Sequence, residues 1–178
     1  MNTPEAVETV GRASGLDLAG KYMTFKLAGE VYGLEILKVR EIIRVMEITR
    51  VPRAQAFMRG VINLRGKIIP VVDLRQKFGM SSAELSEQSV IIVVQCEASA
   101  HQVTMGILVD QVLEMLSIEA AQIEPPPELG TAAHEANFIL GVGKADERVV
   151  LLVDIGRVLS ASESEQLARS LQRIPPGP

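Results

Sequence analysis

The stretch GVINLRGKIIPVVDL, residues 60–74, decides how the rest of the chain is interpreted. Apolar residues run on both sides of Arg65 and Gly66, which is the pattern of two strands joined by a tight turn. Gly66 permits the positive φ that a two-residue hairpin turn requires. Pro70 cannot donate to a strand ladder, so we expect its strand at a sheet edge or at a bulge. We therefore predict a hairpin with Arg65 at its exposed tip.

Most other segments also predict strands. KYMTFKLAG (21–29) alternates polar and apolar residues, as in a half-buried strand, and SVIIVVQC (89–96) and RVVLLVDI (148–155) are apolar runs typical of strands covered on both faces. Only residues 161–178 have helical spacing, and they end in a proline-rich tail. Residues 1–20 are predicted to be a flexible tail.

The chain also contains an internal repeat. YGLEILKVREI (32–42) aligns with MGILVDQVLEM (105–115) at a shift of 73 residues, and residues 57–74 align with residues 138–155 at a shift of 81. The matches include residue types that chance rarely aligns: Gly33 with Gly106, Gly60 with Gly141, and Asp73 with Asp154. We infer two copies of one small β-barrel unit packed on each other, about 21–80 and 89–160.

Asp73 and Asp154 have two interpretations. Each ends a predicted strand and precedes a short turn, where an aspartate caps exposed backbone N–H groups. A pair of catalytic carboxylates is the alternative. Capping accounts for both residues without further assumptions, so we predict structural roles for them.

Composition limits the classes of function. The 178 residues suffice for one compact domain or two small subdomains, and with 3% aromatic residues we expect a core of Val, Ile, Leu, Met and Ala. A net charge of −4 argues against a dedicated nucleic-acid binder. Residues 1–80 carry +5 and residues 81–165 carry −11. Opposite signs suit docking to polar protein surfaces, and a solvated acidic face explains the second part equally well.

No pattern indicates catalysis. Cys96 is the only cysteine, and His101 and His134 have no partner at ligand spacing. GVGK at 141–144 lacks the first glycine and the Ser/Thr of a phosphate loop. We expect no enzyme activity, no metal and no cofactor. The chain shows neither a signal peptide nor a long apolar run, so we expect a cytoplasmic protein.

The sequence leaves the role of Arg65 open. It is either a solvated turn residue, one paired with a nearby acid such as Glu41, or a binding residue on a rigid scaffold. Residues 38–67 carry eight Lys/Arg against two Glu, so a small barrel that binds single-stranded nucleic acid is the alternative function. Such barrels stack bases on aromatic side chains, and only Phe57 accompanies this basic run.

The motifs YGLEILKVREI, GVINLRGKIIPVVDLR and MGILVDQVLEML together resemble the CheW family of bacterial chemotaxis coupling proteins, from about Lys21 to Leu159. The resemblance implies an all-β fold of two five-stranded, Src-homology-3-like barrels around a shared hydrophobic core. First strands can be exchanged between such barrels, so the boundary between the two units is approximate. The CheW-like domain is expected over 21–160 and a C-terminal helix and tail over 161–178.

The resemblance also implies an adaptor. It would bridge the cytoplasmic tips of transmembrane chemoreceptors to the histidine kinase CheA, whose regulatory domain is similar to CheW and alternates with it in rings. The protein would then be recruited to membrane-associated receptor arrays. Whether this chain forms rings of its own is left open.

The resemblance assigns roles to particular residues. Receptor contact is expected in a groove between the barrels, with core packing as the alternative for each residue: Met23, Ile36, Val39 and Ile42. Kinase coupling is expected on the hairpin and beside it: Asn63, Leu64, Arg65 and Glu41. The family requires tight backbone at three glycines: Gly60, Gly106 and Gly141.

Overall fold

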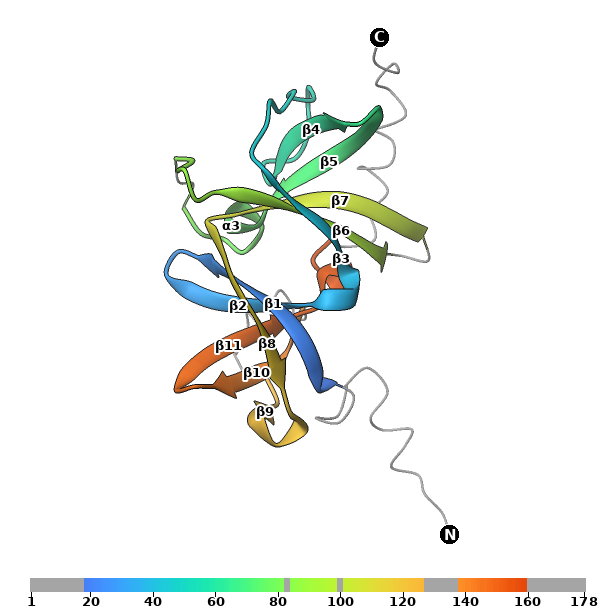
Figure 1. Ribbon diagram of the computed structural model, residues 1–178. Helices are drawn as coiled ribbons and strands as arrows, with labels where there is room; N and C mark the ends of the chain where they lie inside the picture. Colours follow the sequence, from blue (N-terminus) through green and yellow to red (C-terminus); the bar gives the residue numbers. More distant parts are fainter. Residues whose placement is uncertain (1–17, 82–83, 99–100, 127–137, 160–178) are drawn as a thin grey trace.

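The computed structural model describes residues 18–81, 84–98, 101–126 and 138–159, which form two β-sheets with short helical connections (Figure 1). The all-β prediction is confirmed. The predicted N-terminal tail apart from its last residues, the loop at 127–137 and the predicted C-terminal helix lie outside the described residues. Within the part of the chain that is described, no helix is long and apolar enough to cross a membrane.

One sheet, which we call the continuous sheet, is formed by a single stretch of chain. Its strands are β3 (Val39–Arg44), β4 (Met58–Leu64), β5 (Lys67–Asp73), β6 (Val90–Ala98) and β7 (His101–Val109), in the order β3-β6-β7-β5-β4. A short helix, α3 (Leu74–Lys77), follows β5.

The other sheet, which we call the split sheet, combines two separate stretches. Its strands are β1 (Gly20–Leu27), β2 (Glu30–Glu35), β8 (Gln111–Ile118), β9 (Ile123–Glu124), β10 (Ile139–Ala145) and β11 (Arg148–Val153), in the order β8-β1-β2-β11-β10-β9. The described residues also form three 3-10 helices: η1 (Ile36–Lys38) between β2 and β3, η2 (Ala120–Gln122) before β9, and η4 (Ile155–Arg157) after β11.

The five strands of the continuous sheet have equivalents in the split sheet, which the predicted repeat explains, and β9 is the additional strand of the split sheet. Gly33 of β2 pairs in parallel with Leu152 of β11, and Gly106 of β7 pairs in parallel with Val71 of β5, so the pairs differ by the same shifts of 73 and 81 residues. The β1–β2 hairpin therefore has in the split sheet the place that the β6–β7 hairpin has in the continuous sheet. Strands from both expected subdomains occur in each sheet, because each hairpin pairs with strands from the other half of the chain.

The largest hydrophobic cluster lies between the two sheets. It contains buried residues of both, and on the strands facing it every second residue contributes, as with Phe25 and Leu27 of β1 or Ile92 and Val94 of β6. The alternate residues of β6, such as Ile91, enter a second cluster on the other face of the continuous sheet. This explains the uninterrupted apolar sequence of β6, because both faces of the strand are buried.

Most of the shared core is aliphatic, as expected, but aromatic side chains also concentrate in it. Phe25 and Tyr32 lie 5.8 Å apart between ring centroids, Tyr32 and Phe78 lie 5.4 Å apart, and Phe78 stacks on Phe138 at 4.4 Å. These four of the six aromatic residues connect β1 and β2 to the end of α3 and then to the segment before β10. The aromatic residues are therefore few, but they have a structural role in connecting these elements.

The expectation that Pro70 lies on an edge strand is wrong. Strand β5 is interior, between β4 and β7. Pro70 is paired with Val61 of β4, while the parallel pairing with β7 begins one residue later, at Val71. The strand thus accommodates a residue without an N–H because its second ladder starts after the proline.

The predicted structural glycines lie where a side chain would meet neighbouring atoms. A Cβ atom would lie 2.2 Å from the Thr49 carbonyl oxygen at Gly60, 2.9 Å from the Glu124 carbonyl oxygen at Gly141, and 2.6 Å from Ile91 Cγ2 at Gly106. Gly60 and Gly141 are equivalent in the repeat, and each allows a neighbouring backbone segment to approach its strand closely: Thr49 beside β4, and β9 beside β10.

An ion pair of Arg75 and Asp110 joins the two sheets. Arg75 of α3 donates from Nε to Asp110 Oδ1 at 2.9 Å and from Nη2 to Oδ2 at 2.6 Å. Asp110, between β7 and β8, also accepts a hydrogen bond from the Ala28 backbone N–H at 2.9 Å in the β1–β2 turn. The Arg75 hydrogen bonds hold the pKa of the Asp110 carboxyl below its ordinary value.

Replacing Asp110 by Asn should lower the free energy of unfolding by about 1–2 kcal/mol near neutral pH, because charge-assisted hydrogen bonds are lost at a partly exposed site. The folded-state pKa of Asp110 is lowered, so its contribution is complete above the unfolded-state pKa and disappears as the pH falls through the folded value. Urea unfolding at a series of pH values measures both effects.

The matched control is Asp146→Asn, at an exposed turn position with φ of 49°, which asparagine also accepts. This variant should unfold like the wild type at every pH. An equal loss of stability in both variants, or a loss at Asp110 that does not vary with pH, would contradict the assigned role.

Gly60 and Gly66, both in the β4–β5 hairpin, provide a second test of how the structure depends on particular residues. Gly60→Ala should cost about 3 kcal/mol or more, because the added methyl group displaces the Thr49 backbone, whose two 2.8 Å hydrogen bonds to Val61 would be lost. Gly66→Ala, at φ of 89° with open space around it, should cost only about 1 kcal/mol of backbone strain. Thermal and chemical denaturation of both variants would show which loses more stability. A larger loss for Gly66→Ala than for Gly60→Ala would contradict the prediction.

Candidate functional site

The β4–β5 hairpin presents its tip through a two-residue turn. Arg65 and Gly66 both have positive φ, 52° and 89°, as in a type I′ turn. Asn63 supports the turn, since its Oδ1 accepts a hydrogen bond from the Gly66 backbone N–H at 2.9 Å. Leu64 is half-buried against the outer cluster of the continuous sheet. Asn63 and Arg65 are both exposed, and the Arg65 side chain exposes 70% of its full area.

Arg65 is paired with Glu41, one of the interpretations that the sequence left open. Arg65 Nη2 contacts Glu41 Oε2, and this contact raises the pKa of the guanidinium further, so that the arginine stays charged. The split sheet contains a related pair, because Glu114 of β8 lies 3.3 Å from Arg148 at the start of β11. An edge strand is therefore tied to a hairpin in both sheets. Water competes for so exposed a pair, which leaves Arg65 accessible to a partner.

A β-bulge in β3 sorts the predicted residues onto two faces. Val39 pairs with Val94 and Ile42 with Ile92, so both point to the side of the shared core. The register shifts between Val39 and Glu41, and Glu41 consequently points to the opposite face. Without this extra residue Val39 and Ile42, three positions apart, would face opposite sides.

Met23 lies on the same side as the shared core, although it belongs to the split sheet. It pairs with Leu34 of β2, a member of the shared core, and with Met115 of β8. Ile36 lies half-buried in η1, which contacts both β1 and β6. The four predicted receptor residues thus border the junction of the two sheets. Val39 packs on the shared core, so core packing is part of its role.

Two exposed apolar residues at this junction were not predicted. Leu37 of η1 is 82% exposed and Met115 is 51% exposed, against 39% for Ile42. Met115 is the repeat equivalent of Ile42 at the shift of 73 residues, and a matching bulge in β8 precedes it. The repeat was therefore the signal that could have identified Met115, whereas nothing in the sequence marked Leu37 as exposed.

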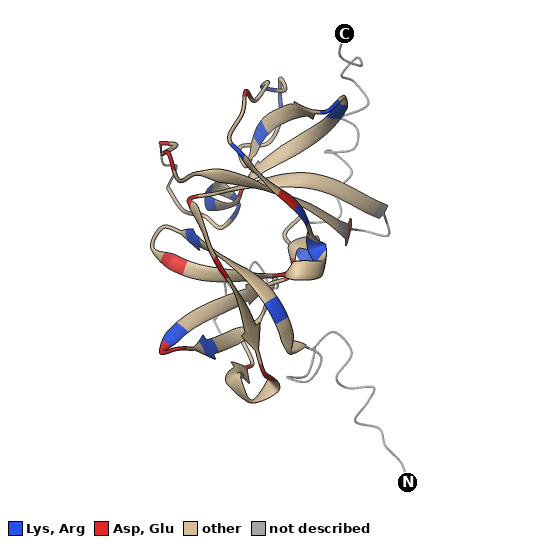
Figure 2. Cartoon of the chain, viewed as in Figure 1, with Lys and Arg blue, Asp and Glu red and all other residues tan. Residues whose placement is uncertain are grey.

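Both sheets carry Lys/Arg and Asp/Glu (Figure 2), but the net charges of their described residues differ in sign. The described residues of 39–109 include nine Lys/Arg and six Asp/Glu, whereas those of 20–35, 111–126 and 138–153 include four Lys/Arg and seven Asp/Glu. The two hairpin tips follow the same division. Asp146 and Glu147 occupy the repeat positions of Arg65 and Gly66, and they also have positive φ, 49° and 64°. Similar backbone turns thus present a basic tip at one end and an acidic tip at the other.

Asp73 and Asp154 are engaged in capping. Asp73 Oδ1 accepts hydrogen bonds from the N–H groups of Arg75 and Gln76, at 3.0 and 3.4 Å. Asp154 Oδ1 accepts one from the Gly156 N–H at 2.9 Å. These contacts leave a catalytic role for the two carboxylates without support.

Among the described residues, no cluster of three His, Cys, Asp or Glu side chains could hold a metal ion. The nucleic-acid alternative also lacks its stacking platform, because Phe57 is only 9% exposed and lies in the shared core. Lys77 Nζ lies 4.9 Å from the centre of the Phe57 ring. A base would find no exposed aromatic ring there.

Comparisons with known proteins agree with this architecture. A family model described as a CheW-like domain matches residues 21–163. Chemotaxis protein CheW of Klebsiella aerogenes is 40% identical over 156 residues, which cover 87% of this chain and 90% of the relative. Chemotaxis protein CheW of Rhizobium meliloti is 34% identical over 143 residues, covering 80% and 89%.

A solved structure is similar in three dimensions. The crystal structure of scaffolding protein TtCheW from Thermoanaerobacter tengcongensis has a TM-score of 0.70 and 36% sequence identity, and the match covers 82% of this chain and 97% of that one. The extent of the family match, the identity to relatives over most of their length and the shared fold lead to one conclusion. This chain belongs to the CheW family.

Proposed function

We propose that this protein is a non-catalytic chemotaxis adaptor that couples the cytoplasmic tips of chemoreceptors to the histidine kinase CheA. Family membership and the description of a similar structure as a scaffolding protein support the adaptor role. The observation that carries the proposal is the bulge in β3, which directs Ile42 toward the junction of the sheets and Glu41 toward the hairpin arginine. Two surfaces on opposite faces of one strand suit a protein that holds two partners.

The receptor surface in this proposal is the apolar rim of the sheet junction. Met23, Ile36, Val39 and Ile42 would contact an amphipathic receptor helix, with Met115 as an additional exposed contact. Exposed large apolar side chains are favoured in such contacts because their removal from water stabilises the complex.

The kinase surface in this proposal is the β4–β5 hairpin. Arg65 would contact the CheW-like regulatory domain of CheA, Asn63 and Leu64 would hold the turn, and Glu41 would orient the arginine. The protein would thereby be recruited to receptor arrays at the membrane. Many modest contacts in such an array would together produce firm attachment.

Ile42→Asp should weaken binding of a chemoreceptor cytoplasmic fragment at least tenfold and leave CheA binding unchanged, because a carboxylate would be desolvated in an apolar contact. Isothermal titration calorimetry with each partner measures the two affinities. The control is Val149→Asp, since Val149 is a 59% exposed apolar residue on the other hairpin. Equal weakening by both variants would exclude the junction as the receptor site.

Arg65→Ala should weaken binding of the CheA regulatory domain by about tenfold or more, as expected for a desolvated interface arginine. Arg53→Ala, at an exposed arginine outside the hairpin, is the control and should bind like the wild type. Glu41→Gln leaves Arg65 charged and should have the smaller effect. If Arg65→Ala binds CheA normally while remaining folded, the hairpin is not the coupling site.

A further inference from the structure

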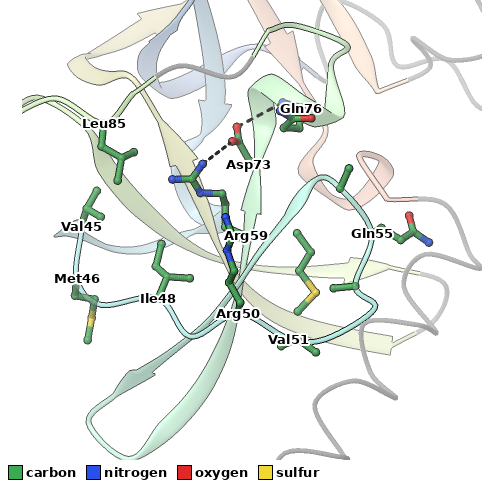
Figure 3. A pocket seen from close by; sticks show the side chains of 13 residues that line it. Val45, Met46, Ile48, Arg50, Val51, Gln55, Arg59, Asp73, Gln76 and Leu85 are labelled. Carbon is green, nitrogen blue, oxygen red and sulfur yellow. Dashed lines mark hydrogen bonds and ion pairs between the residues drawn. The ribbon is translucent and has the colours of Figure 1, made fainter.

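A pocket outside the proposed contacts opens beside the continuous sheet (Figure 3). Its volume is about 520 Å³, within the range of sites that hold a ligand or a short peptide. The segment that follows β3, the start of β4 and the end of β5 line it, and Leu85 closes one side. Figure 3 shows Arg50 and Arg59 in the middle of the lining residues.

Two guanidinium groups in this pocket have unused donors. Arg59 Nη1 lies 3.6 Å from Asp73 Oδ2, too far for a hydrogen bond, and the Arg59 side chain makes no hydrogen bond to the described part of the chain. Arg50 has neither a hydrogen bond nor an ion pair with any described residue. Guanidinium forks of this kind bind carboxylate or phosphate oxygens in pairs.

The balance of charge favours a single carboxylate over phosphate. The lining contains two arginines and one acid, the buried Asp73, so the net charge is +1. One carboxylate neutralises that charge, whereas a phosphate monoester carries close to two negative charges at neutral pH. A phosphate would leave an excess of negative charge in the pocket. Asp73 cannot turn away to reduce it, because its other oxygen caps α3.

The remaining walls favour a peptide over a nucleic acid. Aliphatic side chains surround the arginines, and two of them are well exposed, Met46 at 37% and Leu85 at 44%. No aromatic residue is among those that line the pocket, so a base would have nothing on which to stack. An aliphatic side chain beside a carboxylate would cover Met46 and Leu85 while the arginines bind the acid.

From these features we propose that the pocket is a docking site for a partner's peptide segment in which one acidic side chain is flanked by aliphatic side chains. Arg50 and Arg59 bind the carboxylate, and Met46 and Leu85 contact its aliphatic neighbours. This site goes beyond the proposed function and does not rest on it, because its lining contains no residue of the sheet junction and takes only Met58, Arg59 and Asp73 from the base of the β4–β5 hairpin, away from the Arg65 tip. It would add a third contact to the scaffold.

The test is a titration of the full ¹⁵N-labelled chain with the peptide acetyl-Leu-Glu-Leu-amide. Binding is measured by two-dimensional NMR. Saturable shifts are expected for backbone amides of the pocket residues, and the isostere with glutamine in place of glutamate should bind at least fivefold more weakly. Arg50→Gln should lower the affinity for the acidic peptide at least fivefold. It is the primary variant because Arg50 pairs with no described acid, so the fold does not depend on its charge.

Arg59→Lys is the second variant. It keeps a positive charge opposite Asp73 but removes the fork, and a several-fold loss of affinity is expected. Arg53→Gln is the control, because this exposed arginine of the same segment is not among the lining residues, and its affinity should stay within twofold of the wild type. The proposal is overturned by equal affinity for the glutamine peptide, by no saturable binding, or by Arg50-dependent binding of hexathymidylate at these residues.

Discussion

The hydrophobic core shared by the two sheets is the constraint on which the structure depends. Each sheet has a small cluster of its own on one face, yet the largest hydrophobic cluster lies between the sheets. Within that core, Phe78 from the end of α3 packs between Tyr32 of β2 and Phe138 before β10, and so connects the continuous sheet to the split sheet. Neither sheet can bury its apolar surface alone, so the two units fold as one body. The exchange of hairpins between halves of the chain then reinforces this connection covalently.

Duplication followed by divergence of charge explains why the two ends of the molecule differ. The backbone repeats closely enough that parallel pairs, bulges and positive-φ turns recur at fixed shifts. The side chains at the tips do not recur, since Arg65 on one tip is replaced by Asp146 on the other. The two tips therefore present turn residues of opposite charge to a partner. The two ends of such a scaffold can be distinguished by a partner, whereas the ends of a symmetric pair of units could not.

The sequence predicted features that depend on local pattern. The strands, the hairpin with its Arg65–Gly66 turn, the capping aspartates and the repeat all follow from spacing and residue type. It could not predict which half of the chain each hairpin joins, because β2 and β7 carry equivalent patterns and either could pair beside β5 or β11. Nor could it reveal the bulge in β3, which consists of one additional residue whose type gives no signal. The pocket was missed because its residues come from three separate segments.

The bulge in β3 also determines how binding at one surface can affect another. Residues of both proposed surfaces lie within four positions on one strand. If a receptor displaced that strand, Glu41 and its partner Arg65 would also be displaced. The core behind β3 is tightly packed, and the Arg75–Asp110 pair fixes the β1–β2 turn against α3. A rigid body of this kind transmits a change of position and loses little of it to internal motion. We infer that coupling in this protein depends on fixed geometry between partners, with no large rearrangement of the scaffold itself.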